Sequence, residues 1–253
     1  MNNIIHYPLA VFGLSFIAMW VSAWVGLTGL RKHRILTDET REDYNFILSA
    51  VLTLLGLVIG FSFSMAITRY DQRKNYEEAE ANAIGTEYVR ADLLPTDAAM
   101  KVRGLLRDYL EQRVLFYKSR NEREVQQINE RTTRLQGELW AAILAPSAAQ
   151  PTPVIALAVS GMNDVLNSKG YTQAAWWNRI PNGAWALMAV IAIACNLLIG
   201  HGSRNMAAGF KLIPILPLVI AVAFMVIADI DSPRNGLIRV KPQNLISLAD
   251  SLR

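Results

Sequence analysis

The chain has 253 residues, of which 52% are hydrophobic and 18% charged, and its mean hydropathy is positive. This composition excludes a disordered tail and fits a membrane protein better than an ordinary soluble domain. The net charge of +4 is small and scattered, which argues against a nucleic-acid surface, and the single cysteine, Cys195, cannot form an internal disulfide.

Four apolar stretches meet or approach the length of a membrane-spanning helix, which is about 20 residues for a hydrocarbon core roughly 30 Å thick. Val11 to Leu30, Tyr44 to Thr68 and Ile180 to Gly200 contain no Asp, Glu, Lys or Arg. The fourth, Leu212 to Ala228, is shorter, and we expect residues 206–210 to extend it. Together the four stretches predict a multi-pass integral membrane protein.

The first stretch is expected to be a retained helix and not an export signal, because its basic residues follow the apolar run and no small-x-small cleavage site is present. Charge counting leaves the orientation open. With a cytoplasmic amino terminus, nine basic residues flank the spans on the inside and six on the outside. However, Arg31, Lys32 and Arg34 closely follow the first span and favour the opposite orientation.

The segment between the second and third spans is rich in Glu, Arg, Gln and Ala, with helical spacing of its apolar residues and few strand signals. We therefore expect an all-α membrane protein with four transmembrane helices and a helical extramembrane domain inserted between the second and the third. The predicted division is 1–68 for the first two spans, 69–179 for the domain, 180–231 for the last two spans and 232–253 for a C-terminal tail.

The extramembrane domain is predicted to begin with a long helix. The segment Arg69–Asp92 continues the second span with no Gly or Pro before Gly85, so this span is expected to leave the membrane as one helix. A second helix with one apolar face is expected to start at a cap, Thr96. Further predicted features are a break at Ser119–Asn121, a polar helix ending near Ala145, a linker at Ala145–Pro153, a helix from about Val154 to Ser168 that stops at Gly170, and an interfacial approach to the third span at Tyr171–Asn178.

Catalytic and metal-binding patterns are sparse. The chain has no G-x-S-x-G, P-loop or H-E-x-x-H motif. Its three histidines have no His or Cys partner at metal-ligand spacing: His6, His33 and His201. The acidic cluster Glu77, Glu78 and Glu80 could suggest a cation site. However, Arg73 and Lys74 lie one helical turn away, which favours an ion-paired helix face. We expect no enzyme, metal or cofactor.

The second span carries two stripes at four-residue spacing. One consists of small or hydroxyl residues, on which another helix can approach closely: Gly56, Gly60, Ser64 and Thr68. A neighbouring stripe consists of Thr53, Leu57 and Phe61. Periodicity alone indicates only a crowded helix bundle, because small-residue stripes occur more often in plain helix packing than in pores.

The end of the second span carries the most specific motif. The string from Gly60 to Asp71 (GFSFSMAITRYD) resembles the second transmembrane helix of the bestrophins, where a G-F pair precedes a T-R-aromatic exit or, in bacterial members, a Y-D-R variant. Leu36–Glu39 resembles the L-T-E-E stretch between their first two spans. A closer resemblance is to a bacterial family of integral membrane proteins described as bestrophin-like. Four segments carry it: Arg69–Arg73, Glu78–Thr86, Arg90–Pro95 and Asp231–Val240.

This resemblance implies an oligomeric ion channel of the bacterial inner membrane, pentameric and anion-conducting in true bestrophins, with both termini and the helical domain in the cytoplasm. The implied partners are further copies of the chain, the bilayer and small inorganic ions. Aligned on the G-F pair, Thr53, Leu57 and Phe61 fall at the hydrophobic neck of bestrophins. The hydroxyl of Thr53 departs from the family pattern and is expected to make the neck wetter.

The calcium clasp of animal bestrophins, a dense acidic run after the fourth span, is reduced here to Asp229 and Asp231. Two carboxylates are too few for the roughly six to eight oxygen ligands of Ca²⁺, so calcium gating is not expected. Because carboxylates at a span end are costly when they face lipid, these two should lie in water or pair with a base such as Arg234 or Arg239. A turn at residues 233–236 is expected to fold the tail back.

The pore exit is predicted at Arg69, Tyr70, Asp71 and Arg73. Arg69 and Tyr70 occupy positions where a basic flank and an aromatic belt anchor a span. Alternatively, Arg69 or Arg73 pairs with Asp71 or with a glutamate of the next subunit and sets the angle at which the helix leaves the membrane.

Two functions remain open at this point. In the first, several copies place the second span around an axis, and its apolar stripe controls ion passage. In the second, the spans only anchor a helical domain that binds a partner or senses the membrane. The first predicts that the Thr53, Leu57 and Phe61 stripe faces the axis, and the second predicts that it packs against other spans of the same subunit.

Overall fold

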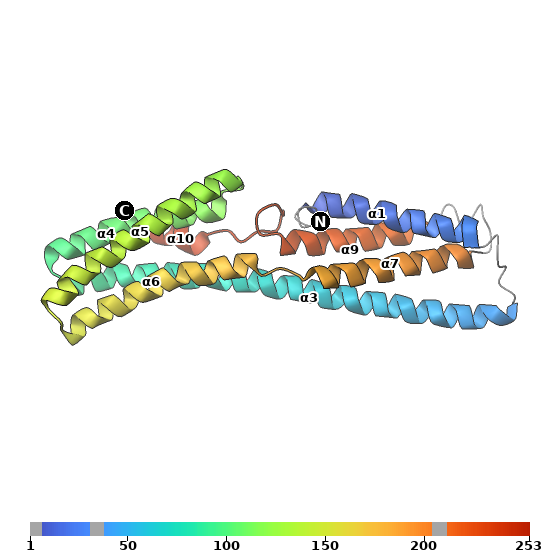
Figure 1. Cartoon of the computed structure of the whole chain (residues 1–253), viewed down its shortest axis with the longest axis horizontal. Helices are drawn as coiled ribbons and strands as arrows, with labels where there is room; N and C mark the ends of the chain where they lie inside the picture. Colours follow the sequence, from blue (N-terminus) through green and yellow to red (C-terminus); the bar gives the residue numbers. More distant parts are fainter. Residues whose placement is uncertain (1–6, 31–37, 204–211) are drawn as a thin grey trace. The chain divides into compact units, whose positions relative to one another are not determined.

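The computed structural model describes residues 7–30, 38–203 and 212–253, and every regular element in these ranges is helical. Figure 1 shows the helices in chain order. They are α1 (Pro8–Val25), the π-helical turn η1 (Gly26–Leu30), α3 (Asp38–Arg90), the 3₁₀ turn η2 (Ala91–Leu93), α4 (Thr96–Lys118), α5 (Glu122–Ala149), α6 (Pro153–Trp177), α7 (Asn182–Gly202), α9 (Ile215–Asp231) and α10 (Gln243–Ser251).

The helices form two units. The first unit comprises residues 1–69 and 179–239, and the second comprises residues 70–178 and 240–253. Helix α3 contributes its first half to one unit and its second half to the other, which confirms that the second predicted span continues as one long helix. The sequence allows this because α3 contains no proline, and its three glycines each cost only about 1 kcal/mol relative to alanine.

The first unit holds the apolar helices α1, α7 and α9 and the first half of α3. Three described stretches are long and apolar enough to cross a membrane, Pro8–Gly29, Thr40–Leu93 and Pro153–Gly202, of which the last contains α7. Helix α9 begins and ends three residues later than the predicted fourth span, and it has 17 residues. The expected extension through residues 206–210 lies outside the described residues.

Helix α7 packs closely against α1 and the turn η1 that follows α1, and glycines lie at these contacts. A methyl group at Gly200 would overlap the carbonyl oxygen of Ala23, and one at Gly26 would overlap the carbonyl oxygen of Leu197. The hydroxyl of Ser22 donates to the carbonyl oxygen of Ile193 at 2.8 Å. The absence of a side chain at both glycines therefore lets the two backbones touch, as small residues do in membrane helix pairs.

This contact makes Gly200 sensitive to the smallest possible substitution. Gly200→Ala is expected to destabilise the protein by about 1–3 kcal/mol, because the added methyl group forces α7 away from α1. Gly13→Ala on α1 is the matched control, since Gly13 faces open space and alanine favours a helix there. Thermal unfolding in detergent should show a lower melting temperature for Gly200→Ala alone. Equal melting temperatures would contradict the backbone contact.

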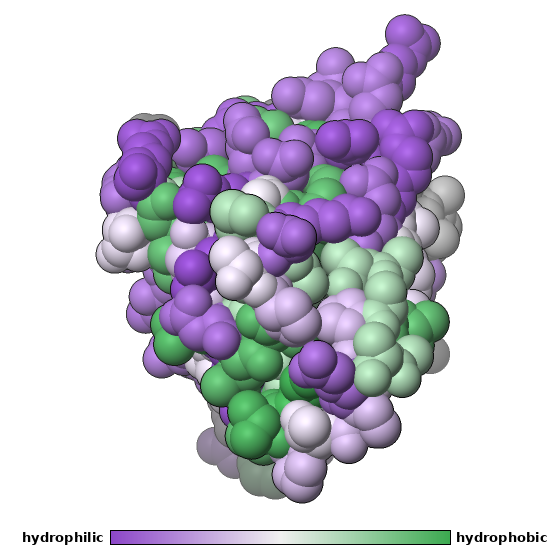
Figure 2. Space-filling model, turned by 90° about the vertical axis from the view of Figure 1, so that its left-hand side faces the viewer, coloured by the Kyte–Doolittle hydropathy of each residue, from purple (hydrophilic) through white to green (hydrophobic). Residues whose placement is uncertain are grey.

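The second unit is a helical bundle with its own apolar core. Helices α4 and α5 form a hairpin, α5 leads into α6, and α10 packs on α4. The core residues come from each long helix of the unit, among them Ile84, Leu106, Leu139, Met162 and Val165, all fully buried. Figure 2 views the molecule from the left-hand side of Figure 1 and shows hydrophilic residues over most of this face, with apolar residues exposed among them.

Some predicted helix boundaries in the second unit are confirmed and others are wrong. The break at Ser119–Asn121 separates α4 from α5, and the Asn121 side chain caps α5 by accepting from the Arg123 N–H. Thr96, however, is the first residue of α4 and not its cap, which is Pro95. The fixed φ of Pro95 and its extended ψ start the helix without a side-chain cap.

The predicted linker and the predicted stop at Gly170 are the larger errors. Helix α5 continues through Pro146 to Ala149, because a proline in the last turn removes only one helical hydrogen bond. Helix α6 runs through Gly170 to Trp177 and not to Ser168. Burial of Val165, Thr172 and Trp176 continues the inward face of α6 across the glycine, and this packing outweighs the low helix propensity of glycine.

Candidate functional site

The two predicted stripes of the second span lie on the exposed part of α3 in the first unit. Leu57 is 52% exposed and Phe61 is 64% exposed. No atoms lie near the open sides of Gly56 and Gly60. Thr53, Ser64 and Thr68 are exposed as well. Neither stripe therefore packs against another helix in the part of the chain that the structure describes.

The buried face of the same half of α3 carries different residues. Leu55, Ser62 and Ala66 are buried, and their separations of seven and four residues place them on one side of the helix. The hydroxyl of Thr53 donates to the carbonyl oxygen of Ser49 at 2.8 Å. Because this hydroxyl is bonded to its own helix, Thr53 is a less hydrophilic member of the apolar stripe than the sequence indicates.

In the first unit, Arg69 lies beside the end of α9. Its Nη1 is 3.8 Å from Oδ1 of Asp231, which is buried. Both carboxylate oxygens of Asp231 also accept from the main-chain N–H of Ile180, at 3.2 Å each. Within the chain, Arg69 therefore pairs with Asp231, which the sequence did not suggest as its partner, and not with the exposed Asp71. A pair with a glutamate of a neighbouring subunit stays a prediction.

Asp229 closes the turn that follows α9. Its carboxylate oxygens accept from the N–H groups of Leu237 and Ile238, at 2.7 and 2.8 Å. A side chain at Gly236 would overlap the carbonyl oxygen of Asp229. The predicted turn at residues 233–236 is thus confirmed, and both terminal carboxylates of α9 hold main-chain groups in place.

The remaining pore-exit residues belong to the second unit. Tyr70 is half-buried against the apolar core. Arg73 is almost fully buried, and its guanidinium donates to the carbonyl oxygens of Ala175 and Asn178, at 3.3 and 3.5 Å. Arg73 therefore binds the C-terminal end of α6, where the last carbonyl groups of a helix lack partners within the helix.

The acidic cluster is not a solvated helix face. Glu77 is buried and accepts from the N–H of Leu245 at 3.0 Å and from the side chain of Asn244 at 2.7 Å, which fixes the start of α10. Glu80 is fully buried and pairs with Arg113 of α4. Only Glu78 is exposed. The interpretation of an ion-paired surface along one helix is therefore wrong for Glu77 and Glu80, whose contacts run to other helices.

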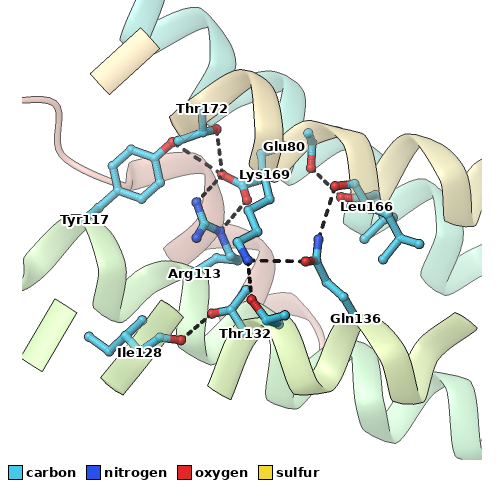
Figure 3. A network of polar contacts seen from close by, with 12 residues as sticks. Glu80, Arg113, Tyr117, Ile128, Thr132, Gln136, Leu166, Lys169 and Thr172 are labelled. Carbon is cyan, nitrogen blue, oxygen red and sulfur yellow. Dashed lines mark hydrogen bonds and ion pairs between the residues drawn. The ribbon is translucent and has the colours of Figure 1, made fainter. Parts of the chain in front are cut away.

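The carboxylate of Glu80 is the centre of a buried polar network, shown in Figure 3. Nε and Nη2 of Arg113 donate to its two oxygens. The hydroxyls of Tyr117 and Thr172 donate to Oε2, at 3.4 and 3.2 Å. Burial raises the pKa of Tyr117, and the negative charge of Glu80 raises it further. Tyr117 therefore stays neutral and serves as a donor.

A lysine extends this network toward α5. The ammonium group of Lys169 donates to Thr133 at 2.8 Å and to Gln136 at 3.3 Å. Burial lowers the pKa of Lys169, and the nearby Arg113 lowers it further. The network joins α3, α4, α5 and α6 through charged and polar groups. Its contacts are those of a buried network that holds helices together, not those of a reaction centre. Among the described residues, no group of three or more metal-ligating side chains lies close enough to hold a metal ion.

Sequence reasoning missed the charged face of α3. Arg73, Glu77, Glu80 and Glu87 are buried, at separations of four, three and seven residues. These spacings continue the buried stripe of Leu55, Ser62 and Ala66 along the same side of the helix. The continuation of this helical spacing from the apolar to the charged residues is the sequence signal that could have identified the buried charges.

Comparison with known proteins gives a consistent family and fold. A family model described as a Bestrophin-like domain matches residues 13–245. A solved single-substitution variant of a membrane protein is 11% identical with a TM-score of 0.66, and 94% of this chain and 96% of that chain are covered. A bacterial bestrophin homologue from Klebsiella pneumoniae is 12% identical with a TM-score of 0.64, over 96% and 95% of the two chains.

A variant of the Klebsiella homologue is 15% identical with a TM-score of 0.59, over 99% of this chain and 96% of that chain. A comparison with curated protein sequences found no match. At these identities the solved structures show a shared fold.

Proposed function

Because the chain belongs to the Bestrophin-like family, we propose that this membrane protein is an ion channel, assembled from several copies of the chain, with the first half of α3 around the pore. We propose further that the assembly is a pentamer and that it conducts anions. The observation that carries it is the outward face of α3, where neither the apolar stripe nor the small-residue stripe contacts another helix among residues 7–30, 38–203 and 212–253.

The composition of this face favours helix contact over lipid contact. A lipid-facing surface gains nothing from glycine or hydroxyl residues, whereas a neighbouring helix can approach closely over them. Gly56 and Gly60 have this property and no partner within the described chain. A second copy placed on the small-residue stripe would leave Leu57 and Phe61 beside the contact, toward a central axis. This arrangement supports the pore assignment of Thr53, Leu57 and Phe61.

The proposed topology has four membrane helices: α1, the first half of α3, α7 and α9. As a helix, α9 is about 25 Å long, close to the hydrocarbon thickness of roughly 30 Å. Asp229 and Asp231 then lie at the membrane boundary, where their main-chain partners offset the cost of burial. The second unit and both termini are placed in the cytoplasm of a bacterium, with the spans in its inner membrane.

A cysteine-accessibility experiment tests the pore assignment. Leu57→Cys should make ion flux through reconstituted protein sensitive to a charged, membrane-impermeant thiol reagent, because a side chain in a water-filled pore can react. The only native cysteine, Cys195, is fully buried and supplies an unreactive background. Val190→Cys on α7 is the matched control, since its side chain is 65% exposed and is expected to face lipid.

Flux that is blocked in Leu57→Cys and unchanged in Val190→Cys supports the channel. Measurable flux that the reagent leaves unchanged in both variants would indicate that another helix lines the pore. If inserted, oligomeric protein passes neither chloride nor potassium, the spans are anchors for the helical unit and the chain does not conduct.

A further inference from the structure

Glu87 is a fully buried carboxyl group in the second unit, on the side of α3 that faces α6. Among the residues that the structure describes, neither of its oxygens has a hydrogen-bond partner. Directly opposite lies Gly161 of α6, where an added methyl group would overlap Oε2 of Glu87. The missing side chain of Gly161 therefore makes room for the carboxyl group beneath the backbone of α6.

Two charged groups act on Glu87 from the helices that enclose it. Arg90, on α3, has Nη1 3.5 Å from the carbonyl oxygen of Leu157, to which it donates, and forms no ion pair with Glu87. Asp164, on α6, is negatively charged and opposes ionisation of Glu87. The pKa of Glu87 is raised to about 8: burial raises it most, the charge of Arg90 lowers it and the charge of Asp164 raises it.

Two arginines of α4 contact Tyr88, the residue that follows Glu87. Arg103 donates to the carbonyl oxygen of Tyr88 at 3.3 Å and pairs with Asp92 of η2. Arg107 donates to the hydroxyl of Tyr88 at 2.6 Å. These contacts place both guanidinium groups at Tyr88, so they do not neutralise Glu87.

We propose that Glu87 is a proton-binding site that couples the contact between α3 and α6 to pH. An ionised carboxylate without a partner is costly in a buried interface, whereas the neutral acid is tolerated far better. After loss of the proton, either water must reach the carboxylate or Arg90 must leave Leu157 to pair with it. Both changes loosen the packing of α6 over Gly161.

The direction of the pH effect follows from proton linkage. The folded protein holds the Glu87 proton up to about pH 8, and the unfolded chain releases it near the ordinary value of 4.5. Between these values the folded state binds more protons, so stability falls as pH rises. Relative to a variant without this group, the unfolding equilibrium constant of the wild type should rise by up to about tenfold for each pH unit in this window.

The test compares full-length wild type, Glu87→Gln and Glu78→Gln in detergent. The melting temperature of the wild type should fall between pH 6 and pH 9 relative to Glu87→Gln. Glu78, which is exposed on the same helix, is the matched control, and Glu78→Gln should follow the wild type. Parallel profiles for all three proteins would overturn the proposal.

Infrared spectroscopy of the wild type provides a second measurement that does not depend on how the variants fold. A protonated carboxyl group has a carbonyl stretching band that disappears on ionisation. We expect such a band to titrate with a midpoint near pH 8, well above the range of ordinary carboxyl groups. A spectrum without any carboxyl band that titrates between pH 6 and pH 10 would overturn the proposal.

Discussion

Arg113→Met is expected to destabilise the second unit by about 3–5 kcal/mol, because it leaves the carboxylate of Glu80 buried without a cation. Arg113 is 1% exposed, and its guanidinium also lies over the ring of Phe116, 4.5 Å from the ring centre. Methionine fills part of the same volume, so the loss comes mainly from the unpaired charge. Urea unfolding of the full-length protein, followed by circular dichroism, measures the effect.

Two further variants make this prediction specific. Arg123→Met changes the same residue type at an exposed position of α5 and should alter stability by less than about 0.5 kcal/mol. Glu80→Gln combined with Arg113→Met should recover part of the loss, because neither position of the pair then carries a buried charge. Equal stability of Arg113→Met and Arg123→Met would show that the ion pair contributes nothing.

Phe61→Ala is expected to raise ion flux at least severalfold without preventing assembly. In the proposed ring, Thr53, Leu57 and Phe61 form successive collars about 6 Å apart along the pore, and the Phe61 collar is the bulkiest. Apolar constrictions hinder ions by excluding water, so removal of the ring should let water and ions pass. Chloride and potassium flux from liposomes of equal protein content measures the change.

Gly60→Leu tests whether the small-residue stripe mediates assembly, separately from the pore function of the apolar stripe. Gly60 faces open space within its own chain, so the bulky side chain should leave the subunit fold intact and prevent close approach of a second copy. Size-exclusion chromatography in detergent should then show smaller particles for Gly60→Leu and wild-type size for Phe61→Ala. Oligomers of unchanged size in both variants would argue against assembly through this stripe.

The sequence predicts much of the fold because long apolar runs and long uninterrupted helices have strong local signals. The charge-free stretches mark α1, α7 and the first half of α3, and the absence of glycine or proline between Arg69 and Gly85 predicts the continuous helix. The resemblance to the bacterial bestrophin-like family, which the match over residues 13–245 confirms, rests on four segments: Arg69–Arg73, Glu78–Thr86, Arg90–Pro95 and Asp231–Val240. The pore assignment of the stripes stays a prediction.

Contacts between distant parts of the chain could not be predicted in the same way. The glycines that bring helices together are Gly26 and Gly200, which belong to different spans and form no regular stripe. Conversely, the regular stripe containing Gly56 has no packing partner among the described residues of its own chain. Spacing shows which residues share a face, but it does not show what that face contacts.

The wrongly predicted helix end at Gly170 shows a related limit. Local propensity predicts a break there, but Thr172 bonds to Glu80 of α3 and Trp176 packs on Phe116 of α4, and a local pattern does not show where these two helices lie. The charges of α3 were misread for the same reason. Glu80 looks like part of a solvated face until Arg113, 33 residues further on, is placed beside it.

The charged inner face of α3 also fixes how this helix fits its neighbours lengthwise. Apolar side chains can exchange one neighbour for another when a helix slides, because contact with any hydrocarbon surface removes them from water. Arg73, Glu77 and Glu80 each require a different group: the end of α6, the start of α10 and the guanidinium of Arg113. A shift of α3 by one turn, about 5.4 Å, would separate all three charged groups from their partners at once. The second unit therefore has a single axial register, in which the second half of α3 cannot slide along the helices packed against it.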